Sequence, residues 1–219
     1  MTAIHLHIIL TVSGSNVQEL SRKRLDFTHL PWYNGAKREG KTCMIRPAKR
    51  TDAARMLEIY APYVRDTAIS LEYVPPTPAE FEARFDRIAS KYPWIVWEEG
   101  ERVMGYAYAD VALSRAAYQW DADLSIYLAP EICGKGIGHI LYDWMERSLR
   151  SLGYVNLYAL VTSDNAASCR FHERRGYALL GVLKRSGFKF GHWHDVSWYG
   201  LRLTGDEPPV GPPRGPELL

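Results

Sequence analysis

Residues 124–152, LSIYLAPEICGKGIGHILYDWMERSLRSL, carry the clearest structural signal in the chain. Leu124 to Leu128 are mostly apolar and predict a buried strand. A glycine-rich turn follows, Cys133-Gly134-Lys135-Gly136-Ile137-Gly138, and an amphipathic helix begins inside it. Gly153 is a natural end for this helix. Its predicted apolar face comprises Ile137, Ile140, Leu141, Trp144, Met145 and Leu149.

The glycine-rich turn has the composition of a ligand-binding turn. Glycines let the backbone bend tightly, and a helix start offers free N–H groups and a positive dipole end. A Walker A loop is excluded, because its Lys-Ser or Lys-Thr pair is absent. A dinucleotide turn needs G-x-G-x-x-G and an acid about 20 residues later, and neither is present. Two interpretations remain: the pyrophosphate loop of an acyl-CoA transferase, and a tight turn that binds nothing.

Two helices and a hairpin are predicted before this stretch. Thr77-Pro78-Ala79-Glu80 combines a capping box with proline at the first helical position. Trp94 to Trp97 and Val103 to Ala109 are predicted strands, joined by a turn at Glu99-Gly100-Glu101. Thr51 is a candidate N-cap for an earlier helix, whose apolar face carries Met56, Ile59, Tyr60 and Tyr63.

Strands and helices continue to alternate after the stretch. Val155 to Val161 predicts a buried strand, and a short helix starts at Asp164 or Asn165. Two final strands are predicted at about Tyr177–Leu183 and Val196–Leu203. This order of elements predicts an α/β or α+β chain around one mixed sheet.

Composition narrows the class of protein. The 219 residues carry a formal charge of +2, with 47% hydrophobic and 24% charged residues, which excludes a disordered or fibrous chain. A charge near zero gives no electrostatic reason to expect nucleic acid or an anionic membrane as partner. No apolar run is long enough to span a bilayer. Three cysteines, Cys43, Cys133 and Cys169, argue against a disulfide framework, so we expect a cytoplasmic protein.

The two ends of the chain differ from its middle. Residues 1–43 lack apolar periodicity, and their basic run follows the apolar stretch rather than preceding it as in a secretory signal. We expect them to be an extension outside the core, or the product of a start codon assigned too early. The compact domain is predicted to span residues 44–204. Residues 205–219 are rich in proline and predict an open tail.

The glycine-rich turn resembles the acetyl-CoA signature of the GNAT acetyltransferase superfamily: Arg or Gln, two residues, Gly, one residue, Gly or Ala. Residues 133–138 match it except at Cys133, which replaces the Arg or Gln. A narrower resemblance, to the phosphinothricin and methionine sulfone N-acetyltransferases, covers about residues 44–203. Its motifs are Tyr92-Pro93-Trp94, Ser163-Asp164-Asn165-Ala166-Ala167-Ser168, Phe171-His172-Glu173, Gly176-Tyr177, Gly187-Phe188-Lys189-Phe190-Gly191 and Trp193-His194-Asp195-Val196.

The resemblance implies a single GNAT-type domain, with a mixed and mostly antiparallel central sheet flanked by helices. It also implies acetyl-CoA as co-substrate and no metal. One strand would splay from its neighbour and leave a V-shaped slot, where Ile126, Tyr127 and Leu128 would pair with the pantetheine arm. Asn165 would bind the same arm, although a plain helix cap explains that residue equally well. The pyrophosphate would be held by Gly134, Lys135, Gly136, Ile137, Gly138 and His139.

Acetyl transfer to an amine requires removal of the ammonium proton and stabilisation of the departing thiolate. The resemblance places Asp123 at the position of the family's catalytic glutamate. Aspartate is one methylene shorter, so we expect relay through water. His172 occupies the place of an acid near the sulfur, and a histidine titrates near neutral pH. A solvent-facing carboxylate and a structural histidine are the alternatives.

The amino acid substrate implied by the resemblance carries a carboxylate, which suits the bidentate fork of an arginine. Arg115 matches the family's substrate arginine, and a solvated loop charge is the alternative. Lys189 and Asp195 are expected to shape the pocket or a dimer seam. For His192 and His194 we expect hairpin packing rather than metal binding. The remaining predicted substrate-binding residues are Leu113, Ser114, Tyr118, Leu124 and Ser125.

The predicted activity is direct transfer of the acetyl group of acetyl-CoA to the α-amine of a small amino acid analogue. Phosphinothricin, methionine sulfone and methionine sulfoximine are the analogues that the resemblance suggests, and detoxification of a herbicide or antimetabolite is the corresponding role. The family pattern implies a homodimer. One alternative is the same fold acting on a peptide N-terminus or a polyamine. The other is a non-catalytic module that binds acetyl-CoA.

Overall fold

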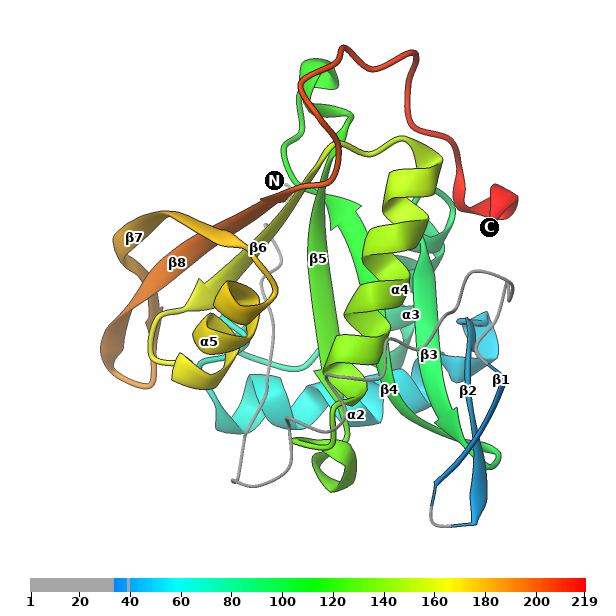
Figure 1. Cartoon of the computed structure of the whole chain (residues 1–219). Helices are drawn as coiled ribbons and strands as arrows, with labels where there is room; N and C mark the ends of the chain where they lie inside the picture. The colour runs from blue at the N-terminus through cyan, green and yellow to red at the C-terminus, as the bar shows by residue number, and fades with distance from the viewer. Residues whose placement is uncertain (1–33, 39) are drawn as a thin grey trace.

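The computed structural model describes residues 34–38 and 40–219, whose strands form one mixed sheet (Figure 1). The strand order is β1-β2-β3-β4-β5-β6-β8-β7, and every neighbouring pair is antiparallel except β5 with β6. The strands are β1 (Asn34–Arg38), β2 (Lys41–Pro47), β3 (Trp94–Glu99), β4 (Arg102–Val111), β5 (Asp121–Leu128), β6 (Asn156–Thr162), β7 (Ala178–Lys189) and β8 (His192–Arg202).

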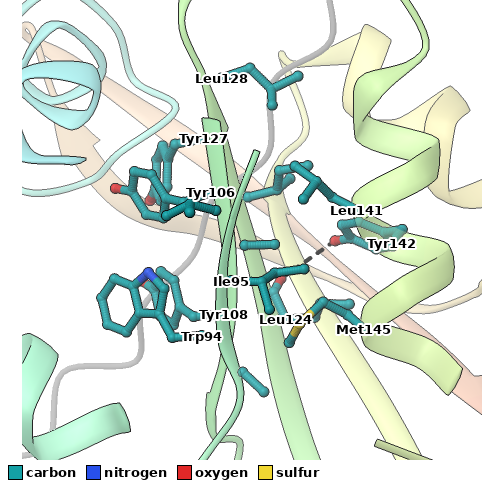
Figure 2. Close-up of a cluster of buried hydrophobic side chains, with 14 of the residues drawn as sticks. Trp94, Ile95, Tyr106, Tyr108, Leu124, Tyr127, Leu128, Leu141, Tyr142 and Met145 are labelled. Carbon is teal, nitrogen blue, oxygen red and sulfur yellow. Dashed lines mark hydrogen bonds between the residues drawn. The ribbon is translucent and has the colours of Figure 1, made fainter. Parts of the chain in front are cut away.

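Helices cover both faces of the sheet, as expected for the predicted fold class. Aromatic side chains of β3, β4 and β5 point to one face, where α2 and α3 lie (Figures 1 and 2). Leu141, Tyr142 and Met145 of α4 pack on the other face (Figure 2), and α5 lies against α4. The helices are α2 (Ala53–Asp66), α3 (Pro78–Ala89), α4 (Ile137–Leu152) and α5 (Ala166–Arg174).

Local helix signals in the sequence are largely confirmed. The capping box of α3 forms as predicted, with the Glu80 N–H donating to Thr77 Oγ1 at 3.3 Å and the Thr77 N–H donating to the Glu80 carboxylate at 2.8 Å. Gly153 ends α4 with φ +95°, a conformation that glycine adopts freely. The predicted cap at Thr51 is wrong. A 3-10 turn over Arg50–Asp52 precedes α2, which begins at Ala53.

The final hairpin is longer than predicted. Its strands run to Lys189 and back from His192, whereas the sequence suggested that they end at Leu183 and begin at Val196. A register shift between Leu183 and Gly187 interrupts the alternation of side chains, and Arg185 sits there with φ +50°. Alternation of side chains is the main sequence signal for a strand, and the bulge interrupts it. The second half of the hairpin was therefore not predicted from the sequence.

The sheet also begins earlier than residue 44, the predicted start of the domain. Strand β2 starts at Lys41, pairs with β1, and carries the fully buried Cys43. The other residues of the predicted extension lie outside the described part of the chain. At the other end, the predicted open tail lies against the domain. The Trp120 indole donates to Gly211 O at 2.8 Å, and the Arg214 N–H donates to Leu152 O at 2.8 Å.

Lys189 joins the hairpin to the segment after α2. Its buried ammonium donates to the carbonyl oxygens of Val64, Thr67 and Ser70 at 2.5, 2.8 and 2.6 Å. A C-terminal turn of a helix has unpaired carbonyls and a negative dipole end, so a cation is well placed there. Leu71 contacts the strand so closely that a Cβ at Gly187 would lie 2.6 Å from Leu71 Cδ1. These contacts hold residues 67–72 against β7.

Replacing Lys189 with Met tests this anchor. Each buried carbonyl that loses its donor costs about 1–3 kcal/mol, so the variant should lose at least that much unfolding free energy in urea titration. Lys184→Met is the matched control, since Lys184 lies on the same strand with its side chain 73% exposed and paired with Asp195. An exposed ion pair contributes about 0–1 kcal/mol. Equal losses in the two variants would show that Lys189 anchors nothing.

Candidate functional site

The backbone of β5 separates from β6 soon after the two strands meet. Their parallel pairing covers three positions, Asp121, Ala122 and Asp123, whereas β5 pairs with β4 along its whole length from Ala122 to Leu128. The β6-facing edge of residues 124–128 is therefore left without a strand partner. This edge contains Ile126, Tyr127 and Leu128, which the sequence assigned to the pantetheine arm. An extended chain with amide groups, such as pantetheine, fits an unpaired strand edge.

The glycine-rich turn lies between β5 and α4 and presents backbone donors. Gly134 and Gly136 have φ of +70° and +83°, which a residue with a Cβ adopts only with strain. Gly136 is the N-cap position of α4, and no described side chain caps that helix. The N–H groups of Ile137 and Gly138 therefore remain available, as an anion site requires. Cys133 donates weakly from Sγ to Ala129 O at 3.5 Å, and Lys135 is exposed.

Two side chains that were predicted to contact the coenzyme interact with other parts of the protein. The Asn165 side chain caps α5 by accepting from the Ser168 N–H at 3.1 Å. The His139 ring lies 4.7 Å from the Phe171 ring and beside the Arg175 guanidinium, away from the turn. Burial and the Arg175 charge lower the pKa of His139. If His139 contacts the coenzyme, it therefore does so through its backbone rather than through a charged ring.

Asp123 is buried at the point where the two strands separate. Its cross-strand neighbours are Asp110 on β4 and Tyr158 on β6, and Oδ1 has no hydrogen-bond partner among the described residues. Burial raises the pKa of Asp123 well above its usual range, and the charge of Asp110 adds to the shift. Asp110 is held by Arg87 through two hydrogen bonds of 3.2 and 2.9 Å. The alternative of a solvent-facing carboxylate at position 123 is therefore wrong.

His172 lies in the core rather than at a surface. Its Nδ1 donates to Ser168 O at 2.9 Å, which leaves Nε2 to accept from the Tyr142 hydroxyl at 3.1 Å. The ring stacks on Tyr199 and is fully buried. Burial lowers the pKa of His172 to about 3. The expectation that His172 titrates near neutral pH is therefore wrong, because burial disfavours the charged form of the ring.

Sequence reasoning missed Tyr142. Its hydroxyl lies 3.5 Å from Leu124 O, at the first β5 residue beyond the paired region (Figure 2). The negative charge of Asp123 contributes to the raised pKa of Tyr142, although burial is the larger cause. The two groups thus flank the start of the slot from opposite faces of the sheet. The signal was available, since Tyr142 is spaced three residues from Met145 and seven from Leu149 on the buried face of α4.

The loop between β4 and β5 carries most of the predicted substrate residues. Arg115, Ser114 and Tyr118 are exposed there, and Leu113 is half-buried. Arg115 starts a 3-10 turn over Ala116–Tyr118, and no ion pair joins it to another described residue. Leu124 and Ser125 lie apart from this loop, on buried β5. The assignment of all these residues to substrate binding remains a prediction.

A cation that the sequence did not single out lies on α3. Arg84 of α3 is mostly buried beside the aromatic side chains on the α2 and α3 face of the sheet. It is spaced three residues from Phe81 and four from Ile88, so it belongs to the buried side of α3. A charged residue at apolar helical spacing is the signal that could have identified it.

Metal and membrane sites were also sought in residues 34–38 and 40–219. No group of three or more His, Cys, Asp or Glu side chains there could hold a metal ion. His192 and His194 lie in β8. The His194 ring bonds to Asp164 at 2.8 Å and to Lys189 O at 3.2 Å. No helix in this part of the chain has the length and apolar character that crossing a bilayer demands.

Comparison with known proteins agrees with this geometry. Residues 45–198 match the model of an acetyltransferase (GNAT) domain. The chain belongs to the GNAT acetyltransferase family. It is 32% identical over 171 residues to phosphinothricin N-acetyltransferase of Streptomyces viridochromogenes, which covers 78% of this chain and 93% of the relative.

Two further similarities refine the position of this GNAT chain. An L-methionine sulfoximine/L-methionine sulfone acetyltransferase of Salmonella typhimurium is 32% identical over 160 residues, covering 73% of this chain and 94% of the relative. The crystal structure of a GNAT superfamily phosphinothricin acetyltransferase from Sinorhizobium meliloti, in complex with acetyl-CoA, superposes with a TM-score of 0.74 at 34% identity. That similarity covers 78% of this chain and 95% of the other.

Replacing Gly136 with Val tests the glycine-rich turn. A β-branched residue at φ +83° strains the backbone and fills the space in front of the free N–H groups. Calorimetry should show a loss of acetyl-CoA affinity of at least about tenfold, the equivalent of one lost charge-assisted hydrogen bond of about 1.5 kcal/mol. Gly100→Val is the matched control, because Gly100 also has positive φ but lies in the β3–β4 turn. Unchanged affinity in Gly136→Val would remove the turn from coenzyme binding.

Proposed function

We propose that this GNAT chain transfers the acetyl group of acetyl-CoA to the α-amine of a small amino acid analogue. Phosphinothricin, methionine sulfone and methionine sulfoximine are the candidate acceptors, because relatives bearing those names match most of the chain. The observation that carries the proposal is the buried Asp123 carboxyl at the start of the β5 slot. It places a proton acceptor where the unpaired strand edge begins.

Acetyl-CoA, when bound, supplies an acetyl group already activated as a thioester. The free N–H groups at the start of α4 and the unpaired edge of β5 are the parts of this chain that would hold it. An arriving α-ammonium must lose a proton before its nitrogen can attack. A carboxyl whose pKa is raised by burial is a stronger base, once ionised, than an ordinary aspartate.

Asp123 can take that proton directly or through water, because Oδ1 has no hydrogen-bond partner among the described residues. Its pKa depends on charge nearby. An ammonium beside the carboxyl would favour the ionised form and counteract the effect of burial. The substrate ammonium therefore favours the ionised Asp123 that acts as the base. The free enzyme does not have to bury an unpaired carboxylate.

Tyr142 is the proposed donor on the opposite side of the slot, and His172 positions it. Nε2 of His172 can only accept, since Nδ1 carries the proton given to Ser168 O. The Tyr142 hydroxyl has a single proton, which it donates to Nε2 in the free protein. In the proposed role, the hydroxyl turns from Nε2 and donates to the negative charge that develops in the slot.

An acyl-enzyme is not part of the proposal. Burial raises the pKa of the Cys133 thiol, which disfavours the reactive thiolate. The Cys133 sulfur also faces Ala129 O and has no described histidine as hydrogen-bond partner. Direct transfer requires only that the amine and the thioester meet at Asp123.

We also propose a cytoplasmic homodimer. Exposed apolar side chains on the final hairpin, among them Leu180 and Trp193, support burial against a second copy. Light scattering of the purified chain measures the oligomeric state, and a monomer at micromolar concentration would contradict the dimer.

Thiol release from acetyl-CoA in the presence of an amine panel tests the proposed function. The panel contains phosphinothricin, methionine sulfone, methionine sulfoximine, free methionine, a polyamine and a peptide with a free N-terminus. We expect the three analogues to give the highest kcat/KM. Preference for the peptide or the polyamine would support another GNAT activity. Tight coenzyme binding without turnover on any amine would support a non-catalytic module.

Replacing Asp123 with Asn tests the base. The loss of a general base lowers kcat by about 10²–10⁴-fold, and we expect that range here with little change in acetyl-CoA affinity. The wild-type kcat/KM should rise with pH at values above the usual pKa of an aspartate. The variant should not show this rise. Asp121→Asn is the control, because Asp121 lies on the same strand but bonds to Asn156 at 2.8 Å.

The same variant should be more stable than the wild type at neutral pH. A carboxyl whose folded-state pKa is raised holds a proton that the unfolded chain has released, so its contribution to stability falls as pH rises above about 4. Asparagine cannot ionise and avoids this penalty. The difference in melting temperature between Asp123→Asn and wild type should therefore grow from pH 4 to pH 7. A constant difference would mean that Asp123 ionises normally.

A further inference from the structure

The backbone hydrogen bonds of β5 alternate between its two edges. In an antiparallel pair, every second residue of a strand bonds to the neighbouring strand, and the residues between face the opposite edge. The Ala129 N–H donates to Met104 O at 2.7 Å, so Ala129 and the odd-numbered positions just before it face β4. The even-numbered residues Leu124, Ile126 and Leu128 therefore direct their N–H and C=O groups to the edge that borders the slot.

A tyrosine hydroxyl lies at each end of this edge. The Tyr142 hydroxyl of α4 is 3.5 Å from Leu124 O (Figure 2), and the Tyr63 hydroxyl of α2 donates to Leu128 O. The two hydroxyls come from opposite faces of the sheet, and Ile126 lies between the residues that they approach. The carbonyl at the far end of the edge is thus already paired in the free protein.

Tyr63 is held in place from several sides. Its side chain is buried, and its ring centroid lies 5.5 Å from that of Tyr127. The backbone carbonyl of Tyr63 accepts from Thr67 Oγ1 at 2.6 Å, and the next carbonyl, that of Val64, accepts from Lys189 at 2.5 Å. Burial raises the pKa of Tyr63, so the hydroxyl keeps the proton that it donates.

The Tyr63 hydroxyl meets the segment that joins β5 to the glycine-rich turn. Leu128 ends the strand, a 3-10 turn over Pro130–Ile132 follows, and Cys133 begins the glycine-rich turn. Burial raises the pKa of the Cys133 thiol, and its interaction with Tyr63 offsets part of that rise. One side chain of α2 therefore contacts both ends of residues 128–133.

We propose that Tyr63 is a positioning residue for acetyl-CoA, whose hydroxyl holds residues 128–133 and so keeps the β5 edge and the glycine-rich turn in register with each other. The proposal rests on the acetyl-CoA binding that the proposed function requires. The pantetheine arm and the pyrophosphate belong to one molecule, so the two parts of the protein that bind them need a fixed spacing. A connection that is ordered in advance does not have to be ordered at the expense of binding.

The competing explanation is that Tyr63 only stabilises the core. Tyr60 provides the matched control, because it lies on the same helix and its buried hydroxyl forms a 2.9 Å hydrogen bond with Ser70. Its ring also packs on Tyr127, with the centroids 4.8 Å apart. Removing either hydroxyl deletes a buried hydrogen bond beside the same ring. The bond of Tyr60 lies in the segment after α2, whereas that of Tyr63 lies at the connection to the glycine-rich turn.

Calorimetry with coenzyme A compares wild type, Tyr63→Phe and Tyr60→Phe. The apparent affinity falls with the fraction of molecules in which residues 128–133 are in place. We expect Tyr63→Phe to weaken binding about tenfold, the equivalent of one hydrogen bond of about 1.4 kcal/mol. Tyr60→Phe should bind as tightly as wild type. Unchanged affinity in Tyr63→Phe would overturn the proposal, as would equal weakening in both variants.

Kinetics with two acetyl donors locate the effect. S-acetylpantetheine carries the arm that fits the strand edge but has no pyrophosphate. The kcat/KM of Tyr63→Phe should fall about tenfold for acetyl-CoA and little for S-acetylpantetheine, because the variant loosens the connection to the turn. The kcat at saturating acetyl-CoA should stay at the wild-type value, since the bound coenzyme itself orders the connection. Equal falls for both donors, or a fall confined to kcat, would contradict a positioning role.

The binding measurement does not depend on the acceptor. If wild type binds coenzyme A but acetylates no amine of the panel, the proposed reaction is refuted, and the comparison of the two tyrosine variants still decides the role of Tyr63. If wild type does not bind coenzyme A, the positioning role is refuted.

Discussion

The short parallel contact between β5 and β6 determines what the rest of this molecule can do. After Asp123 the two strands diverge, and β4 is the only described strand that pairs with β5 along residues 124–128. A buried strand edge without a partner leaves backbone donors and acceptors unpaired, which is costly unless a ligand or water pairs with them. This edge of β5 lies beside α4, whose Tyr142 hydroxyl is 3.5 Å from Leu124 O. A bound coenzyme would therefore take the place of a neighbouring strand along the free edge of β5.

Burial on both sides of that edge controls the chemistry. Burial raises the pKa of Asp123, and burial lowers the pKa of His172 to about 3. Both shifts favour the neutral form of the group, one an acid and one a base. Neutral groups cost little to bury, whereas an isolated charge costs several kcal/mol.

Local signals in the sequence predicted the parts of the structure that short-range geometry determines. The Thr77 capping box, the glycine-rich turn and the end of α4 at Gly153 all depend on a few neighbouring residues, and the structure confirms them. Lys189 and Arg84 were not predicted in their places, because their partners are distant in the sequence. Lys189 reaches carbonyls more than a hundred residues away. His172 was placed on the correct helix, but its pKa depends on rings from three other elements.

One departure from the family signature falls where backbone groups, rather than a side chain, would bind the coenzyme. Cys133 replaces an Arg or Gln, yet the positive φ angles that shape the turn belong to Gly134 and Gly136, and the donors belong to Ile137 and Gly138. Asp123 is shorter than glutamate, but a shorter arm leaves space for a water between carboxyl and amine. Under the proposed function, the shorter side chain therefore fits relay of the amine proton through water better than direct contact with the amine.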